Sequence, residues 1–348
     1  MFDYAAHDIL TPSEQPPTLL PLLVQHQDLG AHDPRDHVYG MLGLYQGALE
    51  PRVLPPLLRP DYTKSIAEVC RDATRFALEE QGDLQVLLHL FHRRLETPEE
   101  RELPSWVPRW HRAWNRELDA RRLSYFFRAD GGMAMELLPS NGPNELVLKG
   151  RVVSTVMEAT NKLSYEAWRS VAAMQAFLSS VEQSTSRAQH SIKGSQDTSA
   201  VALALIADRN SEGKPAQAAD AAGYSSFARY IQAGRMPPTL QDLRAAVKNA
   251  AADLDADNAA HFHQAMLRAC TNRKFFLSTA GAIGLGPQDM RAGDLICVLY
   301  GCLWPVVLRT LGDNYEVVGV CYMHGNMYGE AVREQRQPGG VETTFTLI

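Results

Sequence analysis

The segment 31–45, AHDPRDHVYGMLGLY, holds the densest group of side chains whose types could support chemistry. Its charged and titratable members are His32, Asp33, Arg35, Asp36 and His37. Two carboxylates beside imidazoles can move protons or coordinate a metal ion. The local order favours a structural role, because Asp33 before Pro34 is typical of a helix N-cap and Asp36 would lie in the first turn. We therefore expect capping here, together with an ion pair between Arg35 and a carboxylate elsewhere, rather than catalysis.

A second candidate is the turn-rich segment 322–330, YMHGNMYGE, near the end of the chain. It combines a titratable histidine and a glutamate with glycines, which let a backbone approach a ligand closely. We predict that His324 and Glu330 line a pocket and act as its acid–base pair, because loops often carry functional groups. A purely structural turn is the alternative interpretation.

Other residues of suitable type lack the neighbours that chemistry needs. His89 and His92 lie three residues apart, and His261 and His263 two apart, but neither pair has a nearby carboxylate or third ligand in the sequence pattern. The cysteines are scattered, odd in number and form no C-x-x-C pair; they are Cys70, Cys270, Cys297, Cys302 and Cys321. The last three fall in expected strands, where a thiol is usually a small buried side chain. The sequence thus predicts no metal site and no cofactor.

Two further patterns fall short of known catalytic or nucleotide-binding motifs. Ser105 lies in L-P-S-W-V, which is not the G-x-S-x-G elbow of hydrolases. Gly281, Gly284 and Gly286 follow the order G-x-x-G-x-G, with Pro287 next and no βαβ unit around them. We expect a hairpin turn at these glycines.

The elements that would position these residues are helical in most of the chain. Over 65–80 the apolar residues recur at steps of three and four, and Ser65 with Glu68 forms a capping-box pattern. Further helices are expected over 19–30, 84–95, 165–181 and 239–270, the last broken near 255–258. The segment 184–223 is rich in Ser, Gln, Ala, Asp and Gly, which predicts mobile polar loops around a short helix at 201–206.

The pattern changes to β-rich near the end of the chain. Alternation over 145–153 indicates a strand, and the last ninety residues contain short β-rich runs separated by Gly, Pro, Asp and Asn. This predicts an α+β fold, a mainly helical body followed by a small antiparallel barrel-like or meander module. We expect three regions, namely 1–150, 151–270 with its polar insert near 184–223, and the β-rich module 271–348.

Composition narrows the classes of partner. The net charge of −6 and pI near 6.0 disfavour nucleic-acid binding, because such modules usually carry a positive excess. No run of 18 apolar residues is present, and the first ten residues lack the basic start and apolar stretch of a signal peptide. We expect a cytoplasmic protein with no membrane association, and a protein or small-molecule partner that the sequence leaves unspecified.

Several blocks, in a consistent order and spacing, resemble the fungal heterokaryon-incompatibility (HET) protein family. The first three are 31–45, RPDYTKSIAEVCRDATRFAL at 59–78 and LPSWVPRW at 103–110. The β-rich tail continues the likeness, with NRKFFLSTAGAIGLGP, RAGDLICVLYGCLWPVVLR and YEVVGVCYMHGNMYGEAV between residues 272 and 332. The resemblance is to the downstream part of the family pattern.

The resemblance also implies what this sequence does not contain. The family's N-terminal landmarks, a Gly-Tyr-Leu-Ser-Tyr-Trp-Gly type block and a Trp-Ile-Asp…Cys-Ile-Asn-Gln type block, have no counterpart here. The family's proposed death-inducing activity is linked to those blocks and a TIR-like α/β core. We expect either a truncated gene product or a short paralogue with another role.

Two functional hypotheses follow. The first is a HET-related intracellular scaffold or interaction protein of fungal nonself recognition, without the TIR-like effector core. The second is a small-molecule enzyme of fungal secondary metabolism, whose pocket would lie between the helical body and the β-rich tail, because ligand sites favour such junctions.

Overall fold

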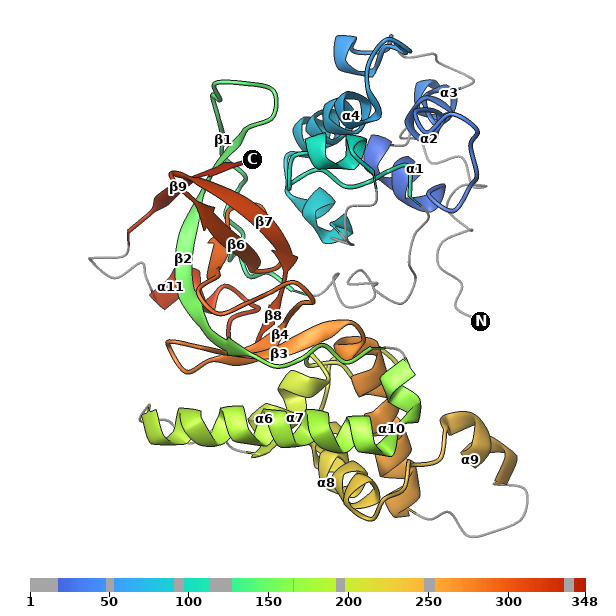
Figure 1. The fold of residues 1–348 in the computed structure, drawn as a ribbon, viewed down its shortest axis with the longest axis vertical. Coiled ribbons are helices and arrows are strands. Elements are labelled where there is room, and N and C mark those ends of the chain that lie inside the picture. The colour runs from blue at the N-terminus through green and yellow to red at the C-terminus, as the bar shows by residue number, and fades with distance from the viewer. Residues whose placement is uncertain are drawn as a thin grey trace.

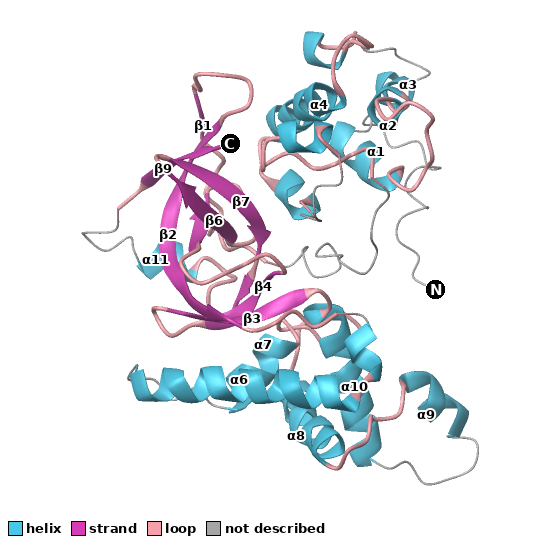
Figure 2. Cartoon of the chain, in the orientation of Figure 1, coloured by secondary structure: helices cyan, strands magenta, loops and turns pink. Residues whose placement is uncertain are grey.

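The computed structural model describes residues 18–47, 53–90, 97–112, 127–164, 166–191, 198–246, 254–334 and 341–348. Helices occupy most of the first part of the chain, and an antiparallel-rich sheet forms most of the last part (Figures 1 and 2). This confirms the predicted α+β fold. Within these ranges no helix combines the length and apolar character needed to cross a lipid bilayer.

The N-terminal helical region is built around one well-capped helix, α4. Its elements are α1 (Leu19–Gln25), α2 (Asp36–Tyr39), α3 (Leu42–Gln46), η1 (Pro56–Leu58), α4 (Ile66–Gln81), η2 (Gln85–His89) and η3 (Glu99–Glu102). The side chain of Ser65 accepts from Glu68 N at 3.2 Å while the Glu68 carboxylate accepts from Ser65 N at 2.8 Å. The predicted capping box is therefore present. Of the expected helix over 84–95, residues 85–89 form a 3₁₀ helix, and 91–96 with His92 lie outside the described residues.

Ser105 connects this helical region to the sheet. Its backbone N–H donates to the carbonyl oxygen of Ile348 at 2.9 Å, and its hydroxyl accepts from Val317 N at 2.8 Å. The neighbouring Trp106 is fully buried and donates its indole N–H to Asn144 O at 2.9 Å. The 103–110 block is thus an ordered loop that holds the two parts of the chain together.

The described strands form one sheet that closes on itself. They are β1 (Leu137–Leu138), β2 (Leu146–Ala159), β3 (Arg273–Ser278), β4 (Ile283–Pro287), β5 (Leu295–Leu299), β6 (Val306–Leu311), β7 (Asn314–Val320), β8 (Tyr322–Met323) and β9 (Thr343–Leu347). The order is β5-β6-β7-β9-β2-β3-β4-β8, and β2 also pairs with β5. Strands β2, β5, β6, β7 and β9 therefore make a closed ring, and β3, β4 and β8 extend it.

Strand β2 closes the ring because it is long enough to serve several neighbours. It pairs with β9 over 146–150, with β5 over 150–155 and with β3 over 156–159. All five ring strands contribute fully buried side chains to one apolar core, as expected when side chains fill a small barrel. The sheet therefore includes strand β2, which spans the expected boundary at residue 150 and lies far before the expected start of the β-rich module at residue 271. The division of the chain into three regions stays a prediction.

A second helical region is inserted between β2 and β3. It contains η5 (Glu166–Arg169), α6 (Val171–Ser191), α7 (Thr198–Leu205), α8 (Ala218–Gln232), α9 (Leu240–Ala246) and α10 (Leu254–Cys270). A last short helix, α11 (Glu330–Glu334), lies between β8 and β9. Figure 1 shows α6 to α10 beside β3 and β4, at the other end of the sheet from α1 to α4. The described residues between 160 and 272 thus form a helical insert between strands β2 and β3.

The insert differs from expectation in two places. Helix α6 continues through 184–191, where loops were expected, because Thr185 donates its hydroxyl to Val181 O at 3.0 Å and so satisfies a buried polar group within the helix. In the 239–270 pattern, 240–246 form α9 and 254–270 form α10, while 247–253 lie outside the described residues. The expected break at 255–258 is wrong, because these residues lie inside α10. Asp255 and Asp257 fall in its first turn, where the helix dipole favours acidic side chains.

Candidate functional site

The polar cluster of segment 31–45 has a structural role. Asp33 accepts from the backbone N–H and Nε of Arg35, both at 2.9 Å, and from Arg35 Nη2 at 2.7 Å. These bonds hold the pKa of Asp33 down, to about 2. Helix α2 begins only at Asp36, so Asp33 closes the turn before the helix rather than capping it. The carboxylate that pairs with Arg35 is that of Asp33, two residues away, and not one from elsewhere in the chain.

Arg35 also joins the two HET-like blocks 31–45 and 59–78. Its Nη1 donates to Tyr62 O at 2.5 Å and to Lys64 O at 3.1 Å, and its guanidinium lies 5.2 Å from the centre of the Tyr62 ring. In return the Tyr62 hydroxyl donates to Asp36 Oδ1 at 2.6 Å. The interpretation as ion pairing rather than catalysis agrees with these contacts.

His324 lies where the helical insert meets the sheet. Its Nδ1 is 2.9 Å from the Tyr322 hydroxyl and 3.8 Å from Asp208 Oδ1. Burial, and next the charge of Asp208, raise the pKa of Tyr322 well above its ordinary value. Ala207 and Asp208 both have left-handed backbone angles, φ 49° and 53°, which non-glycine residues seldom adopt outside constrained sites.

Glu330 makes a separate set of contacts. It starts α11, its Oε2 accepts from Tyr328 N at 2.7 Å, and its Oε1 is 4.0 Å from Arg333 Nη2. His324 instead faces Asp208 and Tyr322. A shared acid–base role for His324 and Glu330 stays a prediction.

The cysteines and His89 are buried, and His263 is half-buried against aromatic rings. All five cysteine thiols are free and buried, and burial raises their pKa values, to about 12 for Cys70 and Cys302. His263 packs between Trp168 and Phe227, with ring centres 5.6 Å apart in each case, and its burial lowers the pKa to about 4. His89 is buried, with an exposed fraction of 7 %. Among described residues, no three His, Cys, Asp or Glu side chains are grouped to hold a metal ion.

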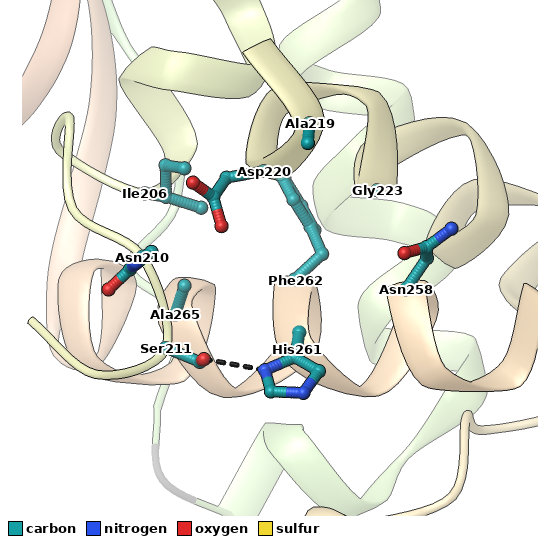
Figure 3. Close-up of a pocket in the computed structure, with 10 residues that line it drawn as sticks. All are labelled: Ile206, Asn210, Ser211, Ala219, Asp220, Gly223, Asn258, His261, Phe262 and Ala265. Atoms are coloured by element: carbon teal, nitrogen blue, oxygen red, sulfur yellow. Dashed lines mark hydrogen bonds between the residues drawn. The ribbon is translucent and has the colours of Figure 1, made fainter. Parts of the chain in front are cut away.

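A cavity of about 180 Å³ opens within the helical insert, between α8, α10 and the loop after α7 (Figure 3). Its lining is mixed, and consists of Ile206, Asn210, Ser211, Ala219, Asp220, Gly223, Asn258, His261, Phe262 and Ala265. Gly223 lets the two helices approach closely, because a Cβ there would meet Asn258 O at 3.0 Å and Phe262 Cβ at 3.2 Å. The close crossing places Asp220 and His261 on the same cavity.

Two of the lining residues interact directly. Ser211 Oγ is 2.6 Å from His261 Nδ1 (Figure 3), and His261 Nε2 is 3.7 Å from Asp257 Oδ1. Ser211 is largely buried, with 7 % of its surface exposed, whereas the His261 side chain is 45 % exposed. A hydroxyl and an imidazole therefore interact at the cavity, and a carboxylate outside its lining lies 3.7 Å from the other imidazole nitrogen.

Sequence reasoning missed this site for two reasons. His261 was weighed only together with His263, although the two side chains lie in different surroundings on α10. Ser211 lies 50 positions away, in a segment expected to be mobile. The available signal was the four-residue spacing of Asp257 and His261, which places them on one helical face.

The fold and these sites define an α+β protein with a mainly antiparallel barrel, in which only β7 and β9 pair in parallel among the described ring strands, and a helical insert. A family model described as the Het-6 beta-barrel domain matches residues 212–338, which run from the middle of the α7–α8 loop to beyond α11. Heterokaryon incompatibility protein 6, OR allele, of Neurospora crassa is 26 % identical over 341 residues, covering 85 % of this chain and 48 % of that protein. No solved structure matches the chain.

The chain is thus similar to proteins of the fungal heterokaryon-incompatibility family, in agreement with the resemblance of its sequence blocks. It spans about half the length of the curated relative that it matches.

Proposed function

We propose that this chain acts in fungal nonself recognition as a cytoplasmic scaffold that binds a partner protein. The observation that carries the proposal is the relationship to heterokaryon incompatibility protein 6, OR allele, across 85 % of the chain. Five free, buried thiols support a reducing compartment.

The packing of the barrel supports binding through an outer surface. Side chains from all five ring strands fill the core, among them Leu148, Val306 and Phe345, each with no exposed surface. A filled barrel cannot take a ligand inside and presents its loops and helical insert to a partner instead.

The alternative, an enzyme of fungal secondary metabolism, would need space at the junction of the helical insert and the sheet. Arg209, Phe127, Trp304 and Tyr322 lie there, and each has at most 1 % of its surface exposed. Phe127 packs edge-on against Trp304, with ring centres 5.0 Å apart. This dense packing speaks against a substrate pocket at the junction and favours the binding role.

The test is binding to the products of incompatibility genes, one at a time. The purified chain would be titrated by calorimetry with each allelic product of the fungus that encodes it. We expect one allelic form to bind with a dissociation constant at least tenfold lower than its alternative, which corresponds to about 1.4 kcal/mol. Equal affinity for every allelic form, or no binding to any, would contradict the proposal.

A further inference from the structure

The Ser211–His261 hydrogen bond does more than connect a loop to helix α10, because it lies at a cavity. Both side chains line the same cavity, so space for another molecule lies directly beside the hydroxyl. We propose that Ser211 is a nucleophile with His261 as its general base, and that the cavity accepts a small, uncharged carboxylic ester. This activity goes beyond partner recognition and rests on different residues.

The loop that carries Ser211 is built to hold it in place. Asn210 Oδ1 accepts from Glu212 N and Lys214 N, both at 3.0 Å, and Asn210 N donates to Lys214 O at 2.9 Å. Arg268 of α10 donates to the carbonyl oxygen of Ser211. A hydroxyl fixed in this way loses little freedom on reaction, which is the advantage of a positioned nucleophile.

Asp257 orients the imidazole. It lies one turn before His261 on α10, and its carboxylate faces Nε2 at 3.7 Å. That carboxylate favours the tautomer of His261 with its proton on Nε2. In this tautomer Nδ1 is free of a proton and accepts from the Ser211 hydroxyl. The roles are those of a Ser-His-Asp triad, with the two ring nitrogens exchanged relative to the serine protease arrangement. Asp257 is thus a positioning residue.

The lining of the cavity sets the class of substrate. Ile206, Phe262 and Ala265 offer apolar contacts for an acyl group, and a volume of about 180 Å³ restricts that group to a short chain. The Asp220 carboxylate disfavours anionic substrates. The amide side chains of Asn210 and Asn258 are hydrogen-bond donors of the kind that stabilise an oxyanion.

The reaction is a hydrolysis in two balanced halves. Ser211 Oγ bonds to the ester carbonyl carbon as its proton passes to His261 Nδ1, and the departing alkoxide takes that proton as its carbon–oxygen bond breaks. Water then attacks the acyl-serine and gives a proton to His261, which returns it to Ser211 as the carboxylic acid leaves. Ester and water are consumed, and acid and alcohol are formed.

The test is covalent labelling of the whole chain with a small alkyl fluorophosphonate, followed by intact mass and peptide mapping. We expect one adduct, on Ser211, and hydrolysis of p-nitrophenyl acetate that stops when the adduct forms. Ser211→Ala should abolish both, and His261→Gln should slow labelling about 100-fold. The matched control is Ser225→Ala, an exposed helical serine bonded to Ala222 O at 2.8 Å, which should label like the parent.

Circular dichroism of each variant separates loss of labelling from loss of fold. Peptide mapping of the adduct on the parent protein tests the proposal without any variant that could fail to fold. No adduct, an adduct on another serine, or an unchanged rate in His261→Gln would each overturn the proposal. For Asp257→Asn we expect the imidazole ¹⁵N shifts of His261 to move towards the Nδ1–H tautomer together with slower labelling. An unchanged tautomer would remove Asp257 from the account.

Discussion

The guanidinium carbon of Arg209 lies 4.7 Å from the centre of the Phe127 ring. Arg209 follows helix α7, and Phe127 lies close to Trp304 and Tyr322 of the barrel region, with ring centres at 5.0 and 6.0 Å. The cation thus packs against an aromatic cluster at which the helical insert and the barrel meet. These two parts of the chain share one core, and we expect them to unfold together.

Truncating Phe127 tests that shared core. Phe127→Ala should lower the free energy of unfolding by about 3–5 kcal/mol, since the ring is 1 % exposed and its loss leaves a cavity. Far-ultraviolet circular dichroism during urea unfolding should still show one transition, at a lower midpoint. The matched control, Val341→Ala, removes a side chain that is 76 % exposed and should change stability by less than about 0.5 kcal/mol. Two separate transitions in the parent would contradict a shared core.

His263 should make stability depend on pH. Its folded pKa is about 4, below the ordinary 6.5, because burial between Trp168 and Phe227 disfavours the charged imidazole. Between pH 4 and 6.5 the unfolded chain therefore binds more protons at His263 than the folded chain does. The contribution of His263 to the free energy of unfolding is complete above about pH 6.5 and is lost as the pH falls towards 4. The loss is on the order of 2–3 kcal/mol.

Urea unfolding at several pH values checks this prediction. His263→Phe keeps an aromatic ring without a titrating group, and its stability should fall less steeply than that of the parent between pH 6.5 and 4. Parallel curves for the two proteins would show that His263 does not carry the effect.

The capping box of α4 should contribute measurably. Ser65→Ala removes the hydroxyl that accepts from Glu68 N, and a lost cap of this kind lowers stability by about 1 kcal/mol. Thermal unfolding of the variant should show a lower midpoint, whereas Ser225→Ala, which lies in the interior of α8, should stay close to the parent. Equal effects in both variants would argue against a special role for the cap.

The thiols should be unreactive in the native protein. Cys70, Cys270, Cys297, Cys302 and Cys321 are buried, and burial raises the pKa of each thiol, which suppresses the reactive thiolate. Titration with a chromogenic disulfide should detect almost no thiol before denaturation and all five after it. Rapid reaction of any cysteine in the folded protein would contradict the packing described above.

Local sequence patterns predicted the local structure well. The capping box of Ser65 and Glu68 is present, and Gly281 lies in the tight turn of the β3–β4 hairpin with φ 82°. Gly284 and Gly286, which were also expected in that turn, lie within strand β4. Both depend on a few adjacent residues. Helix α6 was expected to end near 181, because its Ser- and Gln-rich continuation resembles a loop until the hydroxyls find partners within the helix.

Long-range relationships were not predictable from such patterns. The contact of Ser211 with His261 depends on how the 208–216 loop folds back on α10, and the closure of the barrel depends on β2 pairing with strands more than 100 residues later. Segment 322–330 contributes His324, which meets Asp208 at the junction of the insert and the sheet. No sequence pattern around Asp208 predicts that it lies near His324.

The most direct measurement of the central claim is cell viability after induced expression of this chain in fungal strains that differ only in their incompatibility alleles. Uptake of a membrane-impermeant dye by hyphal compartments would be counted at matched protein levels, with a frame-shifted transcript as the control. A role in nonself recognition predicts many dead compartments in one allelic background and few in the other. Equal viability in all backgrounds, at levels where the protein is folded, would contradict it.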